Sequence, residues 1–169
     1  MRPILASVGF LALIFAPHGA ARAQEPVFQG VHADWRVFTR GEAAGKICYA
    51  LSQPTEALPT GVDHGDVFFL VSSWADGSAD EQPSFLAGYP LKPASPPRAR
   101  VGGDRYTMFV SDREGFLEES GDEDRLVRAM RRGAVLRVEA VSMRGTATVY
   151  EFSLSGVTAA LEAVETLCS

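Results

Sequence analysis

Short alternating or apolar runs dominate the first two thirds of the sequence, and this pattern predicts β-strands. The run Ile47–Gln53 alternates with a period of two, which is typical of a strand with one buried face. Trp35–Thr39 lies just before it, and the glycine-flanked turn at residues 41–45 joins the two runs into a predicted hairpin. Val67–Trp74 is almost entirely apolar and aromatic, which suits a central strand. Shorter strands are predicted at Phe85–Tyr89, Tyr106–Val110 and Gly115–Leu117.

A first helix is predicted after residue 121. Three acidic residues, 122–124, precede an apolar stretch that ends at Met130, and Arg131, Arg132 and Gly133 follow it. Acids at the start and cations at the end of a helix are stabilised by its dipole, and a glycine favours a left-handed C-cap. The order of these residues therefore predicts a short helix that ends at the glycine.

A second helix is predicted at the end of the sequence. Val157, Leu161, Val164 and Cys168 recur at spacings of three and four residues, which places them on one apolar face. Ser155 precedes them and is a suitable N-cap residue. This segment therefore predicts an amphipathic helix that packs on the rest of the protein.

The remaining segments complete the expected architecture. Two further strands are predicted between the helices, at residues 134–143 and 146–154. An extended arm is predicted at residues 24–34, a loop at 54–66, and a proline-rich crossover at 91–97. Many short strands with two late helices predict a mainly β protein, either a β-sandwich or a partly open barrel. We expect one such domain over residues 24–169.

The first 23 residues have the layout of a secretory signal peptide. Arg2 supplies a positive start, Ile4–Ala16 is uncharged and mostly apolar, and Ala21-Arg22-Ala23 offers a small-x-small cleavage pattern. The apolar run is too short to cross a hydrocarbon core of ~30 Å as a stable anchor. We therefore predict cleavage after Ala23 and export to a bacterial periplasm or beyond, with no stable membrane span in residues 24–169. The alternative is an uncleaved N-terminal anchor.

Composition and charge fit a globular domain and argue against several classes of protein. Hydrophobic residues make up 46% of the 169 residues, charged residues make up 22%, and the net charge is -5. Residues 1–23 carry two arginines and no acid, so their removal leaves a net charge of -7. No basic excess indicates a nucleic-acid partner. Two cysteines are too few for a four-cysteine zinc site.

Few residues have the spacing of a catalytic or metal site. Asp63, His64 and Asp66 lie together in a glycine-flanked loop and could offer oxygens and an imidazole to a metal, but solvated loop residues are the simpler interpretation. The sequence contains no nucleophile elbow, phosphate-binding loop or dinucleotide fingerprint. We therefore expect no catalytic residue, no metal and no cofactor, and we predict that the protein is not an enzyme.

Two other groups of side chains have both a functional and a structural interpretation. One is aromatic and lines either a ligand pocket or the core; its members are Trp35, Phe68, Phe69 and Trp74. The other forms a basic edge on the first predicted helix, available to a partner or an anionic lipid or simply solvated; its members are Arg125, Arg128, Arg131 and Arg132.

Several local patterns, taken in order, resemble the invasion associated locus B family of Gram-negative secreted proteins, in its shorter and divergent branch. The matching stretches are Trp35–Thr39, Lys46–Thr55, Gly88–Pro93, Leu126–Gly133, Ser142–Thr146 and Phe152–Gly156. The resemblance implies an immunoglobulin-like β-sandwich, a periplasmic or envelope location and, for some members, a part in host-cell invasion. It implies no catalytic residues. The Gly-Cys pair of longer members is absent, and residues 113–116 stand in its place.

The two cysteines form the clearest constellation in the sequence. An oxidising compartment and an even cysteine count favour a disulfide between Cys48 and Cys168, which would fasten the last helix to an early strand. Two buried free thiols are the alternative. A redox pair fits less well, because the Cys-x-x-Cys spacing is missing.

Two functional classes remain. The first is a non-enzymatic exported envelope protein that binds an unidentified envelope or host protein, for example through loops 54–66 and 91–105. The second is a carrier of a small hydrophobic ligand, with the aromatic side chains around a cavity. A filled core between the sheets would favour the first class, and an open cavity of several hundred Å³ would favour the second.

Overall fold

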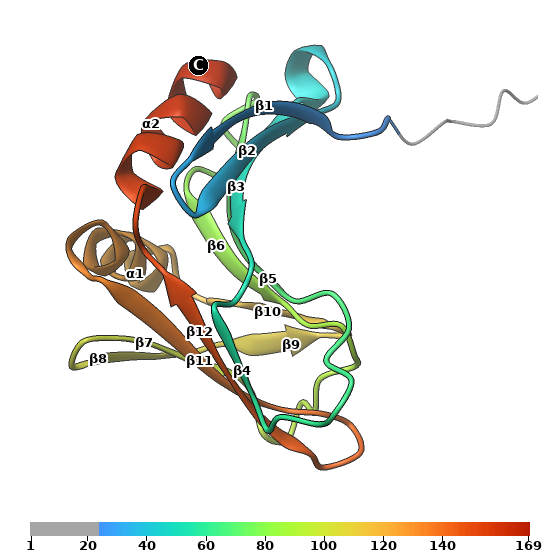
Figure 1. Ribbon diagram of the computed structural model, residues 1–169. Coiled ribbons are helices and arrows are strands. Elements are labelled where there is room, and N and C mark those ends of the chain that lie inside the picture. The colour runs from blue at the N-terminus through green and yellow to red at the C-terminus, as the bar shows by residue number, and fades with distance from the viewer. Residues whose placement is uncertain (1–23) are drawn as a thin grey trace, which may run out of the picture.

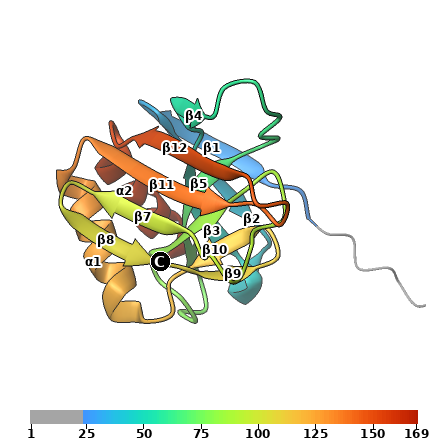
Figure 2. The same cartoon turned by 90° about the horizontal axis from the view of Figure 1, so that it is seen from below.

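The computed structural model describes residues 24–169 and contains two antiparallel sheets and two α-helices (Figure 1). Across the larger sheet, the strands in order are β1 (Val27–His32), β2 (Trp35–Arg40), β3 (Ile47–Ser52), β5 (Phe68–Trp74), β6 (Gln82–Leu86), β10 (Glu114–Phe116) and β9 (Phe109–Ser111). Across the smaller sheet they are β4 (Glu56–Leu58), β12 (Ala147–Ser153), β11 (Val135–Val141), β7 (Arg98–Val101) and β8 (Asp104–Thr107), side by side in Figure 2. The helices are α1 (Ser120–Arg132) and α2 (Val157–Cys168).

The predicted mainly β, sandwich-type fold with two helices is confirmed, and the two sheets do not close into a barrel. The predicted signal peptide, residues 1–23, lies outside the described residues. Among residues 24–169, neither helix combines the length and the apolar character that crossing a membrane requires.

The larger sheet is strongly curved, and two different layers cover its concave face (Figure 1). Helix α2 contacts β1, β2, β3 and β5 on one half of this face, while the smaller sheet covers the other half. Aromatic rings fill the space between the sheets, with Phe69 5.8 Å from Phe152 and Phe85 5.5 Å from Tyr150 between ring centroids. Helix α1 contacts β6, β7 and β8 and buries Leu126 at one end of the sandwich.

The strands with the clearest sequence patterns form as predicted. β2 and β3 pair as an antiparallel hairpin, and β3 buries every second residue, including Cys48 and Ala50. β5 lies in the middle of the larger sheet and buries Phe69 and Val71, while Phe68 lies half-buried on the opposite face. The long apolar run therefore reflects a strand that is apolar on both faces, only one of which is fully covered.

Five segments differ from the prediction. The predicted strand Tyr106–Val110 is divided between β8 in the smaller sheet and β9 in the larger one, and the strand predicted at Phe85–Tyr89 lies earlier, at β6. The predicted arm at residues 24–34 contains strand β1, which pairs with β2 across a two-residue turn at Ala33–Asp34. The predicted loop at 54–66 contains β4, which pairs with β12. Residues 98–101, for which no strand was predicted, form β7 as the chain crosses from the larger to the smaller sheet.

Both predicted helix caps were wrong in detail. Gly133 ends α1 with a φ of -87°, which is not left-handed. Its small size matters instead, because a Cβ there would lie 2.5 Å from Val101 Cγ1. Gly156, and not Ser155, is the N-cap residue of α2, with a φ of +88°, and a Cβ there would overlap the carbonyl oxygen of His32.

The predicted disulfide is present. Cys48 on β3 and Cys168 at the end of α2 are bonded, with an S–S distance of 2.07 Å. Beside it, Lys46 Nζ donates a hydrogen bond of 2.6 Å to the carbonyl oxygen of Leu167. The end of α2 is thus joined to the larger sheet by both a covalent and a polar contact.

Candidate functional site

A row of hydrogen-bonded polar side chains lies beneath a surface cleft of about 520 Å³. Loop residues 62–64 form one wall of the cleft, and residues 142–148, which comprise the turn between β11 and β12 and the start of β12, form another. Tyr89 and Pro90, which follow β6, complete the lining. The cleft therefore lies where the loop before β5 meets the ends of three strands.

The hydrogen bonds of the row have one consistent direction when the His64 ring is neutral. His64 Nε2 lies 3.1 Å from the carbonyl oxygen of Pro59, which can only accept, so Nε2 carries the hydrogen. Nδ1 then accepts from the Tyr150 hydroxyl at 2.8 Å. The Tyr150 oxygen accepts from the Tyr89 hydroxyl at 2.9 Å, and the Tyr89 oxygen accepts from Thr148 at 2.5 Å. Each of the two tyrosine hydroxyls thus donates once and accepts once, and the single hydrogen of Thr148 is used at Tyr89 and not at the carbonyl oxygen of Ala140, 3.3 Å away.

Tyr150 is the member of the row with a strongly raised pKa. Its side chain is fully buried, and this burial raises the pKa of Tyr150 far above its usual value of 10.0. The phenol therefore keeps its proton throughout the physiological range. The row can fix the position and tautomer of His64, but it does not supply a phenolate base.

Two glycines allow the loop that carries His64 to lie directly on the end of β6. A Cβ on Gly88 would lie 2.7 Å from Gly65 Cα and 2.8 Å from the Asp66 nitrogen. Gly65 has a φ of +60°, and its N–H donates a hydrogen bond of 2.9 Å to Asp63 Oδ1. The close backbone approach brings the His64 ring to within hydrogen-bonding distance of Tyr150.

The structure separates the residues of the predicted metal-type cluster. Asp63 and Asp66 are exposed, whereas His64 is half-buried and bonded at both ring nitrogens, so the solvated-loop interpretation was wrong for His64. Within residues 24–169, no group of three or more His, Cys, Asp or Glu side chains converges as a metal site. Sequence reasoning missed Tyr89, Thr148 and Tyr150; the available signal was a tyrosine at a core-facing position of β12.

The four aromatic residues that sequence analysis grouped together lie on two different faces. Trp35 and Phe69 are fully buried on the concave face of the larger sheet, where Trp35 Nε1 donates to the carbonyl oxygen of Ser153 at 3.0 Å. Phe68 and Trp74 lie on the convex face. These four side chains therefore do not line one pocket.

The convex face of the larger sheet carries a half-exposed apolar surface, which we call the outer face. Phe28, Phe38 and Tyr49 are neighbours across β1, β2 and β3, with ring centroids 5.5 and 5.6 Å apart. Arg36 and Arg40 flank Phe38 on β2, and neither forms an ion pair with a residue in the described part of the chain. Other large apolar side chains of this face are Ile47, Leu51, Phe68, Leu70, Trp74 and Leu86.

Most of the predicted basic edge on α1 is paired with carboxylates. Arg125 pairs with Asp122, Arg128 lies 3.8 Å from Asp124, and Arg131 pairs with Glu81.

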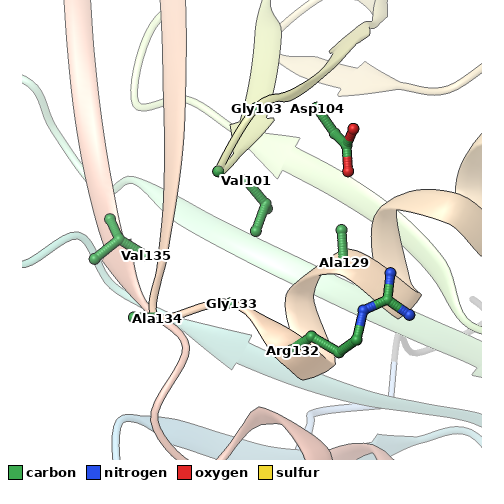
Figure 3. A pocket seen from close by; sticks show the side chains of 9 residues that line it. Val101, Gly103, Asp104, Ala129, Arg132, Gly133, Ala134 and Val135 are labelled. Carbon is green, nitrogen blue, oxygen red and sulfur yellow. The ribbon is translucent and has the colours of Figure 1, made fainter.

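The fourth arginine of that edge, Arg132, lines a shallow cleft of about 450 Å³ between the end of α1 and the turn of the β7–β8 hairpin. Figure 3 shows Arg132 and Asp104 on opposite sides of this cleft, with Val101 and Ala129 between them. The helix therefore does not present a continuous cationic surface.

A match to a protein family includes most of the residues described above. The family model of the Invasion associated locus B (IalB) protein matches residues 35–165. The chain belongs to the invasion associated locus B family. The match runs from the first residue of β2 into α2 and includes every member of the hydrogen-bonded row. No curated protein and no solved structure gives a significant match to the chain.

Family membership confirms the predicted resemblance. It connects the IalB chain, by the name of its family, with an invasion-associated locus. Together with the disulfide between Cys48 and Cys168, it indicates a protein of an extracytoplasmic compartment.

Proposed function

We propose that this IalB-family chain is an exported, non-enzymatic protein of the bacterial envelope that binds another protein through its outer face. The partner is an envelope or host protein, and a role in invasion would follow from that contact. The observation that carries the proposal is the composition of the outer face, where aromatic and aliphatic side chains surround Arg36 and Arg40. Tyrosine, tryptophan and arginine are the side chains that most often dominate binding energy at protein interfaces.

The electrostatics of the outer face also support a partner. The chain as a whole has a net charge of -5, yet two arginines that form no ion pair within residues 24–169, Arg36 and Arg40, flank Phe38 on this face. Burial raises the pKa of the Tyr49 hydroxyl, while Arg40 acts to lower it, so this arginine is close to the ring. A partner that covers this face would gain both apolar burial and two charge-assisted contacts.

A carrier of a small hydrophobic ligand is less well supported. The aromatic side chains between the sheets, Phe69, Phe85, Tyr150 and Phe152, have no exposed surface and fill the core with their own contacts. The cleft above His64 opens to the surface and has hydroxyl, imidazole and guanidinium groups in its walls. Such a lining suits a polar ligand better than a hydrophobic one.

The absence of a catalytic role is part of the same proposal. Nucleophilic catalysis needs an activated nucleophile next to a base that a third group orients, and acid–base catalysis needs a titratable group that can exchange a proton with the substrate. In the described residues, His64 instead contacts a tyrosine that keeps its proton and a backbone carbonyl.

The proposal is tested by capture of envelope proteins on immobilised protein comprising residues 24–169. A protein that binds through the outer face should bind at least about tenfold more weakly to the double variant Arg36→Glu/Arg40→Glu. Arg98→Glu, an exposed arginine on the smaller sheet, is the matched control and should bind normally. Capture that is equal for all three proteins would overturn the outer face as the binding surface. A co-purified hydrophobic compound without any protein would favour the carrier.

A further inference from the structure

The larger sheet ends in a strand with an unpaired edge that runs beside a groove. In the described residues β1 pairs only with β2. A groove of about 430 Å³ separates β1 from α2, which lies alongside it in Figure 1. Gln29 and His32 line it from β1, Val37 from β2, and Glu162, Ala163 and Leu167 from α2. A strand edge and a helix thus form the two walls of one groove.

The free edge has one irregularity in its register but otherwise lacks the features that usually protect an edge strand. Natural edges are blocked by lysine, proline, inward charges or strong bulges. β1 contains no lysine, arginine, acid or proline, and Val27, Phe28 and Val31 are 58%, 54% and 56% exposed. A single register shift interrupts its pairing with β2, between Phe28 and Gly30. The edge is therefore open to another strand.

The position of the backbone groups at this edge follows from the hairpin. His32 and Trp35 flank a two-residue turn and form a hydrogen-bonded pair, as such turns require. Antiparallel pairs alternate between bonded and non-bonded positions, so the N–H and C=O of Val31, opposite Arg36, point away from β2. Val31 thus offers one donor and one acceptor to a strand added at this edge.

The negative charge of α2 favours an added strand with basic side chains. Helix α2 has two exposed glutamates, Glu162 and Glu165, and no lysine or arginine. Neither glutamate forms an ion pair with a residue in the range 24–169. The groove beneath Glu162 has an apolar floor at Val37 and Leu167, along which the stem of a lysine or arginine could lie.

We infer that an extended, basic segment of a partner protein adds a strand to β1 in this groove, an inference that rests on the proposed function. Side chains alternate along a strand, so one set lies beside Phe28 and Val31 and the other enters the groove. The first set is apolar, and the second carries a lysine or arginine opposite Glu162. A second copy of this chain is a poorer occupant, because it would bring another acidic α2 to the same edge.

The probe for this inference is a short peptide that alternates lysine and valine. Its counterpart alternates glutamate and valine. Each is titrated into isotope-labelled protein comprising residues 24–169 while backbone amide signals are recorded. The lysine peptide should shift amides in β1 and α2 and slow hydrogen exchange at Val31, and the glutamate peptide should bind at least about tenfold more weakly. Shifts confined to other elements would overturn the inference.

Substitutions separate the charge contact from the strand contact. Glu162→Lys should reverse the preference between the two peptides, whereas Glu165→Lys makes the same charge change on α2 outside the groove lining and should not reverse it. Val31→Pro removes the outward N–H and should abolish binding of the lysine peptide, while Val31→Thr should retain it. Equal effects of the two glutamate variants would overturn the inference even if Val31→Pro fails to fold.

The outcomes also separate this inference from the function on which it rests. Envelope-protein capture that depends on Arg36 and Arg40 but is unchanged by Glu162→Lys would leave the proposed function standing and overturn the groove as the strand site. Capture of envelope proteins that does not depend on Arg36 and Arg40, with binding of the lysine peptide to β1 retained, would overturn the proposed function and leave the groove as the strand site. Self-association that disappears in Val31→Pro and in Glu162→Lys would assign the edge to a second copy of the chain and overturn the partner strand.

Discussion

His64 and Tyr150 are 86 residues apart in the sequence and are joined by a hydrogen bond of 2.8 Å between Nδ1 and the phenol oxygen. Their rings also meet edge to face, with centroids 5.3 Å apart and an interplanar angle of 80°. This contact ties the loop before β5 to the core of the smaller sheet. It also fixes the position of His64, which lines the cleft.

Replacing Tyr150 with phenylalanine should destabilise the fold while leaving the ring in place. The change removes the hydroxyl that donates to His64 and accepts from Tyr89, and it leaves the Tyr89 hydroxyl without that partner. We expect a loss of about 1–3 kcal/mol in the free energy of unfolding, measured with denaturant. Tyr106→Phe alters a buried tyrosine outside the row and is the control. Equal losses in the two variants would show that the row has no special energetic role.

Gly88→Ala should displace the loop that carries His64. The added methyl group would meet the backbone of Gly65 and Asp66, which cannot move aside as a flexible side chain can. We expect a loss of about 1–3 kcal/mol and a changed His64 ring signal in NMR spectra. Gly103→Ala, where no atom lies within 4 Å of the added carbon, should leave both unchanged. An unshifted His64 signal in Gly88→Ala would contradict the role of the glycine contact.

Cys168→Ser should lower the melting temperature markedly. The disulfide closes a separation of 120 residues, for which the chain-entropy model gives about 4–5 kcal/mol. A reductant should lower the melting temperature of the unmodified protein in the same way and should have no further effect on the variant. Equal melting temperatures with and without reductant in the unmodified protein would contradict a stabilising disulfide.

Glu81→Gln should change how stability depends on pH. Burial raises the pKa of Glu81 above its usual value of 4.5, although Arg131 acts in the opposite direction. A raised folded pKa means that the protonated form favours folding, so this contribution is complete below pH 4.5 and is lost as the pH rises through the folded pKa. Relative to Glu81→Gln, the unmodified protein should therefore lose free energy of unfolding as the pH rises from this value.

The comparison for Glu81 is best made with denaturant series at several pH values. Glu118→Gln, at an exposed glutamate, serves as the control and should keep the pH profile of the unmodified protein. A difference between the unmodified protein and Glu81→Gln that stays constant, or that grows with pH, would contradict the expected sign.

The elements with strong local patterns were predictable, and those shaped by tertiary contacts were not. β3 alternates and β5 is a long apolar run, so each carries its own signal. In β1, the register shift between Phe28 and Gly30 interrupts the alternation, and its apolar side chains are exposed, so the segment has no clear period. β7 has only four residues, which is too short for a pattern to stand out.

The candidate site shows the same division. The pairing of Cys48 with Cys168 was predictable because the chain offers only two cysteines and an oxidising destination was expected. The contact of His64 with Tyr150 depends on Gly65 lying against Gly88, which no local pattern in the sequence reveals. The outer face was also not predicted, because the apolar sequence of a strand does not show which of the strand's two faces is covered by another layer.

The place of α2 in the order of the chain has a consequence for the proposed export of the protein through a translocation pore. Helix α2 covers one half of the concave face of the larger sheet, and it follows every strand in the sequence. If the N-terminus of the chain passes through a pore first, β2 and β3 reach the far side long before α2, the helix that covers them. Until residues 157–168 have crossed, the half of the concave face that α2 covers is exposed to solvent. A stalled intermediate would therefore expose it to chaperones and proteases.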